Sequence, residues 1–121
     1  MIREESTLVV ADNTGAKLAK CFRILGQHRE FAHVGDIIRV SIREAAPTGA
    51  VKKGQVCTAI VVRTAAPIRR PDGSLVRFDQ NACVIVDAKF QPLGSRVFGP
   101  VPRELRDSKC PKIISMAPEA V

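Results

Sequence analysis

The side chains best suited to chemistry in this sequence are arginines and lysines gathered in its middle third. Residues 39–77 hold eight Lys/Arg against two acids, so this segment carries +6 of the formal net charge of +7. A basic excess confined to one segment is typical of a surface that binds a polyanion, and we favour nucleic acid over a solvated surface of mixed charge. A membrane surface is disfavoured, since no amphipathic helical stretch carries the charge.

Two of these arginines, Arg69 and Arg70, stand side by side before the turn sequence Pro71-Asp72-Gly73. We expect an arginine pair at such a turn to be exposed, and guanidinium groups suit bidentate contact with phosphate. The alternative is an edge hairpin kept soluble by its charge. The candidate RNA-binding residues are all eight cations of the segment: Arg39, Arg43, Lys52, Lys53, Arg63, Arg69, Arg70 and Arg77.

Catalytic and metal-binding patterns are absent from the sequence. It has no Gly-x-Ser-x-Gly or His-Glu-x-x-His motif, and "GAVKKGQV" (49–56) lacks the Lys-Ser/Thr pair that follows the second glycine of a P-loop. His28 and His33 make a poor metal site. The cysteines are too far apart for a zinc or redox motif and are expected to be buried, reduced thiols: Cys21, Cys57, Cys83 and Cys110. We therefore predict no catalytic residues, no metal and no cofactor, and no enzyme.

The elements that must position the cations are short strands. Apolar or alternating runs separated by turn residues occupy 7–12, 17–26, 36–44, 55–64, 74–78 and 82–87. Short strands without intervening helices predict a mainly β fold, a small antiparallel β-barrel that is closed or nearly closed. At 121 residues the chain is expected to form a single domain, 1–121.

One hairpin is expected to project from this barrel. We predict that strands 56–62 and 74–78 pair and are joined through 64–73. Arg69 and Arg70 would then lie near its end, with Arg63 and Arg77 at its base.

The pattern changes after Gly99, where a C-terminal helical segment (99–121) is expected to follow the barrel and hairpin (1–98). Pro102 and Pro111 are each placed to open a short helix. Helices of this length are not stable alone, so they must dock on the barrel or on a partner. We expect this segment to be an interaction surface more than a core.

The N-terminal residues carry acids early and lack a basic-then-apolar leader, which favours a cytoplasmic protein, with synthesis inside an organelle left open. No run approaches the ~20 apolar residues of a membrane span. The chain has five Phe and neither Trp nor Tyr, and no aromatic cluster coincides with the basic segment. Base stacking is therefore disfavoured, and phosphate contact with folded, double-helical RNA is preferred.

Several long motifs occur in order along the whole chain: "VADNTGAK" (10–17), "VGDIIRVSI" (34–42), "VKKGQV" (51–56), "VVRTAAPIRRPDGSLVRFDQNACVI" (61–85) and "FGPVPRELR" (98–106). On these motifs the sequence resembles the bacterial-type family of large-subunit ribosomal protein number fourteen. The resemblance implies a five-stranded barrel with a projecting hairpin and a C-terminal helical segment. It implies a structural, ribosome-bound role in the large subunit.

The resemblance also implies partners. These are large-subunit rRNA, small-subunit rRNA at inter-subunit bridges, and the neighbouring ribosomal proteins numbers three and nineteen, with the family's ribosome-silencing factor as a further partner. By motif position, Lys52, Lys53, Arg69 and Arg70 would face RNA. The partner and bridge surface would include Arg96, Arg103 and Arg106. A free β-barrel module acting as an RNA chaperone or translation factor is the alternative function.

The chain departs from many members of this family in being less basic at three places: 26–32, 46–50 and 65–67. The family's phosphate contacts at those places are therefore not assigned to this chain.

Overall fold

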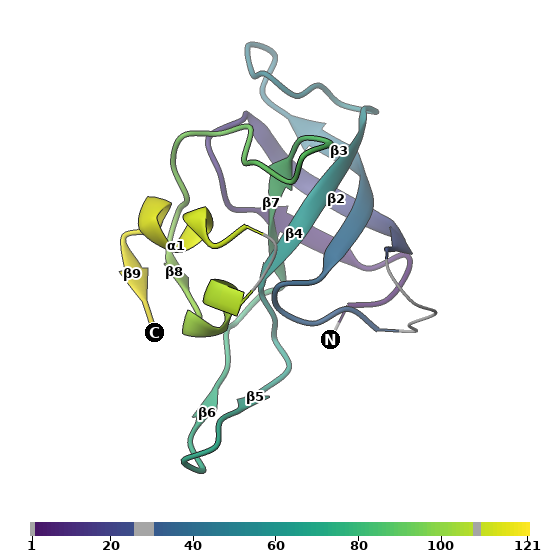
Figure 1. Ribbon diagram of the computed structural model, residues 1–121. Coiled ribbons are helices and arrows are strands. Elements are labelled where there is room, and N and C mark those ends of the chain that lie inside the picture. The colour runs from purple at the N-terminus through teal and green to yellow at the C-terminus, as the bar shows by residue number, and fades with distance from the viewer. Residues whose placement is uncertain (1, 26–30, 108–109) are drawn as a thin grey trace.

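Five strands form a closed barrel in the computed structural model, which describes residues 2–25, 31–107 and 110–121 (Figure 1). In barrel order they are β1 (Thr7–Val10), β2 (Ala16–Ile24), β3 (Ile37–Ala45), β4 (Val56–Arg63) and β7 (Ala82–Val86). The prediction of a mainly β fold built on a small five-stranded barrel is confirmed. Of the less basic segments, most of 26–32 lies outside the described residues.

One seam of the barrel differs from the antiparallel arrangement that we predicted. The pairs β1–β2, β2–β3, β3–β4 and β4–β7 are antiparallel, but β1 and β7 pair in parallel, with Val9 opposite Ala82. The reason is geometric. When an odd number of strands alternates in direction around a barrel, the first and last strands point the same way, so the seam that closes it is parallel.

The interior of the barrel is filled by small and branched apolar side chains. Ala19, Val40 and Ala59, from three neighbouring strands, are each 0% exposed. The larger interior side chains include Leu8, Ile38, Ile42 and Ile85. Cys21, Cys57 and Cys83 belong to the same cluster, and Cys110 is buried elsewhere, so the four free cysteines are buried as predicted.

A second apolar cluster covers the outer side of β4 and β7. Ile60 and Val62 on β4 and Val84 on β7 point away from the interior cluster and pack instead with residues of the C-terminal segment. These two strands are therefore buried on both faces, which explains why their sequences, "CTAIVV" and "ACVIV", are almost continuously apolar. By contrast, "IIRVSIRE" in β3 alternates, as a strand with one solvent-facing side does.

The C-terminal segment runs through β8 (Pro100–Val101), the 3-10 helix η1 (Arg103–Asp107), α1 (Lys112–Met116) and β9 (Glu119–Ala120), which pairs in parallel with β8. Short helices after Pro102 and Pro111 are present as expected, the first as a 3-10 helix. The expectation of an interaction surface rather than a core is wrong for Val101, Leu105 and Ile113, which are each 0% exposed. No helix in the described part of the chain is long and apolar enough to cross a membrane.

The projecting hairpin is shorter than predicted and pairs differently. β5 (Ile68–Arg69) pairs with β6 (Leu75–Val76), whereas β4 pairs with β3 and β7. The expected pairing of 56–62 with 74–78 is therefore wrong. Both edges of β4 are needed to close the barrel, so the following residues form a separate two-stranded sheet, which extends from one end of the barrel (Figure 1).

Candidate nucleic-acid interface

The outer side of β2 and β3 brings four cations together. The alternating sequences of these strands place apolar residues inside and leave Lys20, Arg23, Arg39 and Arg43 outside. In the ladder Lys20 lies opposite Ser41, and Arg23 lies opposite Arg39. The register of β2 and β3 thus fixes the spacing between the Cα atoms of these four residues, independently of their side-chain rotamers.

The pairing of Arg23 with Arg39 is electrostatically unfavourable within the protein. Like charges directly opposite one another on a sheet destabilise it. Arg39 donates one hydrogen bond from Nη1 to Thr58 Oγ1 at 2.9 Å, and neither arginine forms an ion pair with another described residue. An anion bound between the two guanidinium groups would remove the repulsion.

A loop at one end of this face carries Lys52 and Lys53, both exposed. The loop is held against the start of β2, because a Cβ at Gly49 would lie only 2.7 Å from both Gly15 Cα and Thr14 O. Only glycine allows this approach of two main chains. Within the turn, Lys52 N donates to Gln55 Oε1 at 3.2 Å, which ties the two ends of the turn together.

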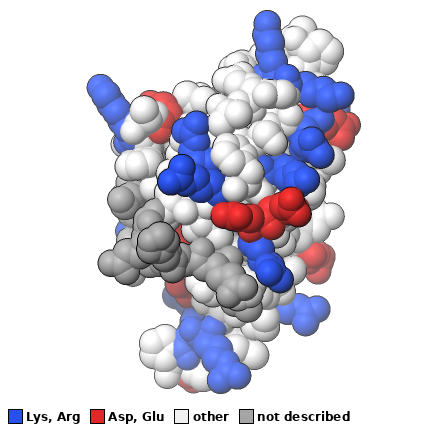
Figure 2. All heavy atoms as spheres, turned by 90° about the vertical axis from the view of Figure 1, so that its right-hand side faces the viewer, with Lys and Arg blue, Asp and Glu red and all other residues white. Residues whose placement is uncertain are grey.

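The cations form a broad face rather than one continuous patch. Figure 2 shows the side of the molecule that lies to the right in Figure 1, with Lys and Arg spread from the top of the molecule to the hairpin at the bottom. Acidic side chains interrupt this surface between the upper and lower groups. Two acidic residues near the N-terminus, Glu4 and Glu5, lie close to β2. Glu5 N donates a hydrogen bond to Cys21 O, and the negative charge of the Glu4 carboxylate contributes to the raised pKa of the Cys21 thiol.

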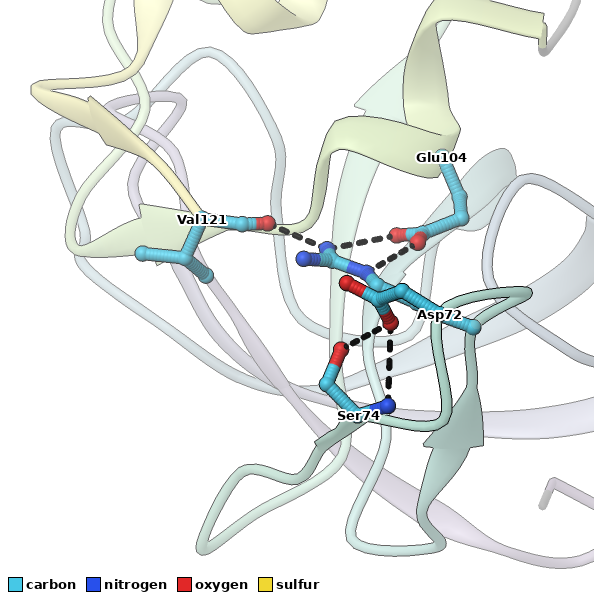
Figure 3. Close-up of polar contacts among 5 residues, drawn as sticks. Asp72, Ser74, Glu104 and Val121 are labelled. Atoms are coloured by element: carbon cyan, nitrogen blue, oxygen red, sulfur yellow. Dashed lines mark hydrogen bonds and ion pairs between the residues drawn. The ribbon is translucent and has the colours of Figure 1, made fainter.

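At the hairpin tip, Asp72 closes the turn. Its Oδ1 accepts hydrogen bonds from Ser74 Oγ at 2.6 Å and Ser74 N at 2.9 Å (Figure 3). The hydroxyl bond, followed by the amide bond, lowers the pKa of Asp72 below its usual value. Gly73 has a φ of +89°, as the turn requires, and open space around it.

The two neighbouring arginines of the hairpin have different environments. Arg69 is exposed, whereas the Arg70 side chain is only 12% exposed and points to the C-terminal segment. Arg70 donates from Nε to Glu104 Oε1 at 2.7 Å, from Nη2 to Glu104 Oε2 at 3.2 Å, and also from Nη2 to the main-chain oxygen of Val121 (Figure 3). The expectation that both arginines are held out to solvent is therefore wrong for Arg70.

We call this contact of Arg70 with Glu104 and Val121 the hairpin clamp. Its ion pair lowers the pKa of Glu104, chiefly through the hydrogen bond from Arg70, and raises the pKa of Arg70 for the same reason. The clamp joins the hairpin to η1 and to the end of β9, elements far away in the sequence. An anion that bound Arg70 through the same donors would have to displace a carboxylate.

Arg63 also points toward the C-terminal segment. It lies at the end of β4, half-buried, and donates from Nη1 to Phe98 O at 2.9 Å and Pro100 O at 3.3 Å. Burial lowers the pKa of this guanidinium, although an arginine remains protonated. Gly99 leaves room for it, because a Cβ there would meet Nη1 at 2.2 Å. Of the two residues predicted at the hairpin base, only Arg77 is exposed.

The three residues predicted for the partner surface lie on the C-terminal side. Arg96 stacks over the ring of Phe98, with 6.0 Å between Cζ and the ring centroid, and Phe98 is 49% exposed. Arg103 and Arg106 are exposed on η1. Their side chains are thus accessible, whereas Leu105, the apolar residue of the same helix, is buried in the cluster that covers β4 and β7.

Sequence reasoning missed Lys20 and Arg23. Residues 1–38 have equal numbers of basic and acidic groups, so counting charge by segment concealed them. The alternation in "KLAKCFRI" was the available signal, since it places cations on the polar side of a strand. The face was identifiable only by combining that alternation with the β2–β3 register.

No metal centre is evident in the part of the chain that the structure describes, where no three His, Cys, Asp or Glu residues are grouped to hold an ion. His33 is exposed, and its backbone N donates to Asp36 Oδ2 at 2.8 Å, while His28 lies outside the described residues. Burial raises the pKa of the Cys21, Cys57 and Cys83 thiols, which makes them poor nucleophiles.

Comparison with known protein families identifies the family of the chain. The model of the family described as ribosomal protein L14p/L23e matches residues 1–121, the whole chain. This family is structural and non-enzymatic. The match confirms the family that the sequence motifs suggested. The chain therefore belongs to the ribosomal protein L14p/L23e family and is a structural ribosomal protein of the large subunit.

Proposed function

We propose that this protein binds large-subunit rRNA through the outer side of β2 and β3, with the loop at 50–54 and the hairpin extending the contact at either end. The observation that carries this proposal is the Arg23–Arg39 pair on the open face of the barrel. A protein gains nothing in stability from opposed guanidinium groups, whereas a phosphate between them is bound by both.

The contacts are made to the RNA backbone. Among the described residues no helix or long ribbon lies on this face to enter a groove, and the cations are spaced by strands rather than carried by one element. Phosphate contacts of this type position a protein on folded RNA without reading its sequence. The exposed candidates for phosphate contact are Arg23, Arg43, Lys52, Lys53, Arg69 and Arg77, and Lys20 and Arg39 are half-exposed among them.

Arg63 and Arg70 have a different role in this proposal. Their donors are directed to Phe98, Pro100, Glu104 and Val121, so they hold the C-terminal segment against the rest of the molecule. That segment then presents Arg103 and Arg106, together with Arg96 just before it, to neighbouring ribosomal proteins, including numbers three and nineteen, to small-subunit rRNA, and to the silencing factor.

The salt dependence of rRNA binding tests the proposal. In filter binding to large-subunit rRNA, Arg43→Ala and Arg69→Ala are each expected to reduce the slope of log K against log salt by about 0.7–0.9, the value for one phosphate contact. Lys89→Ala removes an exposed cation from the loop after β7 and serves as the matched control, with an unchanged slope. Unchanged slopes for Arg43→Ala and Arg69→Ala would contradict phosphate contact by this face.

Sedimentation tests the assembly. We expect the protein to co-sediment with large subunits through a sucrose gradient after a moderate salt wash. Recovery only in the unbound fraction would favour a free RNA-binding module instead.

A further inference from the structure

A cavity of about 430 Å³ lies beside the base of the hairpin, outside the face described above. Its lining consists of Arg63 at the end of β4, Pro100 in β8, and the three consecutive residues Phe78, Asp79 and Gln80 that follow the hairpin. This volume is within the range of small-molecule sites. None of its other lining residues belongs to the proposed phosphate-binding face, and Arg63 was assigned above to holding the C-terminal segment.

One wall of the cavity is pre-organised. Both carbonyl bonds of Arg63 come from Nη1, so the position of the guanidinium plane is fixed while Nε and Nη2 have no acceptor among the described residues. Gly99, whose φ is +80°, has no Cβ, and this leaves the space that the Arg63 guanidinium occupies. A guanidinium plane that is held by main-chain carbonyls can stack on a flat ring without first losing side-chain entropy.

Phe78 contributes an aromatic wall. Its backbone N donates to Thr64 O at 3.3 Å, which ties it to the end of β4, and its side chain is only partly buried. The sequence showed no aromatic cluster within the basic segment, and base stacking was therefore disfavoured. The fold supplies one aromatic ring, because it brings Phe78 to the same cavity as Arg63, fifteen positions earlier in the chain.

Asp79 and Gln80 place unused hydrogen-bonding groups at the cavity. Both are exposed, and neither side chain has a hydrogen-bond partner among the described residues. The Asp79 carboxylate only accepts hydrogen bonds and repels phosphate, whereas the Gln80 amide both donates and accepts. The ligand that matches these groups is flat, lacks negative charge at the cavity, and presents N–H donors along one edge.

We propose that this cavity receives one unstacked nucleobase of the bound RNA, with guanine preferred. The base stacks against Phe78 and Arg63, and its N1–H and N2–H groups donate to the Asp79 carboxylate. Uracil is disfavoured because two carbonyl oxygens flank its single N–H and would face the carboxylate. This inference rests on the proposed RNA-binding function and adds base recognition to a surface that otherwise contacts only phosphate.

Titration of the isotope-labelled full chain with nucleoside monophosphates, followed by NMR, tests the proposal. GMP is expected to shift the amides of 78–80 and the Gln80 side-chain amide with an apparent affinity about tenfold above that of UMP. IMP, which lacks the 2-amino group, is expected to fall between them. Ribose 5-phosphate, which lacks a base, should leave these resonances in place. Equal shifts with ribose 5-phosphate, or no shift at 78–80 with GMP, would overturn the proposal.

Three variants sharpen the test. Phe78→Leu is expected to weaken GMP binding about tenfold through lost stacking. Asp79→Asn is expected to remove the preference for GMP over UMP, and it keeps the proposal testable should the Phe78 variant fold poorly. Glu119→Gln makes the same change of charge at an exposed position outside the cavity and should preserve the preference. Retained GMP preference in Asp79→Asn would contradict the assigned recognition.

The outcome separates this inference from the proposed function. If the phosphate-face variants flatten the salt dependence of rRNA binding while GMP behaves as ribose 5-phosphate does, the rRNA-binding role stands and the base site is wrong. If the chain fails to bind rRNA at all, the proposed function itself fails.

Discussion

The two outer sides of the barrel differ in composition and in burial. The side formed by β2 and β3 alternates apolar and charged residues and remains open, whereas the side formed by β4 and β7 is apolar throughout and is covered by the C-terminal segment. Both sides belong to the same closed sheet and share one interior. The difference shows that the outward residues of a barrel strand can be buried within the fold or left open to solvent, and that the periodicity of the strand indicates which.

Truncation of a residue on each side should separate stability from binding. Ile60 is 0% exposed beneath the C-terminal segment. The substitution Ile60→Ala is expected to lower the unfolding free energy of the protein by about 2–5 kcal/mol, because apolar burial is lost and a cavity remains. Arg43→Ala on the open side should change stability by no more than about 0.5 kcal/mol. Chemical denaturation measures the unfolding free energy of both variants. The salt dependence of rRNA binding should change in Arg43→Ala and stay nearly unchanged in Ile60→Ala. A large stability loss in Arg43→Ala would break the distinction.

The loop at the end of the open side should depend on one close contact. Gly49→Ala forces a Cβ to within 2.7 Å of Gly15 Cα and Thr14 O, both main-chain atoms, and is expected to cost about 1–3 kcal/mol. Gly54→Ala in the same loop has open space around it but a φ of +85°, so it should cost only about 1 kcal/mol. Thermal unfolding of the two variants compares steric with conformational cost. Equal losses would show that the contact of the two glycines is not limiting.

Asp12 lies at the parallel seam, where it joins the end of β1 to β7. Its Oδ1 accepts from Thr14 Oγ1 at 2.6 Å and Thr14 N at 3.2 Å, and its Oδ2 accepts from Ile85 N at 2.9 Å. Burial nevertheless raises the pKa of Asp12 above the usual value, because desolvation outweighs these hydrogen bonds. The native state then binds this proton more tightly than the unfolded state does, so ionisation of Asp12 lowers stability.

The expected pH dependence follows from that sign. The Asp12 contribution to unfolding free energy should fall as pH rises from the unfolded-state pKa of about 3.9 through the higher folded-state pKa. Asp12→Asn leaves the Ile85 N–H facing an amide and is expected to be less stable by about 1–3 kcal/mol, with a deficit that narrows as pH rises through this window. Denaturation between acidic and neutral pH measures the deficit, and the carboxyl ¹³C shift reports the pKa. A folded-state midpoint at or below 3.9 would contradict this account.

The sequence was sufficient for the parts of the fold that local patterns determine. Alternation in β3 and continuous apolar runs in β4 and β7 located the barrel strands, and Pro102 and Pro111 located the short helices. The hairpin pairing failed because 74–78 and 56–62 were matched as neighbours, whereas closure of the barrel reserves both edges of β4 for β3 and β7. Which strands compete for an edge is a property of the whole sheet, and it cannot be seen in a local stretch of sequence.

The sequence predicted which cationic residues the candidate site contains, but not which of their side chains are exposed to solvent. Arg43, Lys52 and Arg69 stand exposed, whereas Arg63 and Arg70 are turned to acceptors more than thirty positions later in the chain. A charge count treats all five alike, because it does not include the oxygens that reach them in the folded state. The cavity beside Phe78 was hidden for the same reason, since its walls come from separate parts of the sequence.

The hairpin clamp should affect local opening more than global stability. Glu104→Gln removes the charge that Arg70 contacts, so we expect faster hydrogen exchange at the β5–β6 amides with little change in the unfolding midpoint. Acid should have the same effect in the native chain. Because the pKa of Glu104 is lowered in the folded state, the contribution of the clamp is present above the unfolded pKa of about 4.3 and is lost as pH falls through the folded value.

Glu119→Gln, which alters an exposed carboxylate that makes no ion pair with a described residue, is the control for the clamp and should leave exchange in the hairpin unchanged. If exchange at Ile68 and Val76 is equally slow in both variants, the hairpin is held by its own turn, with Asp72 and Ser74 sufficient to fix it. If only Glu104→Gln loosens it, the orientation of Arg69 on the hairpin depends on the C-terminal segment. Contacts that a partner makes at Arg103 or Arg106 would then influence, through η1, the hairpin that we propose contacts RNA.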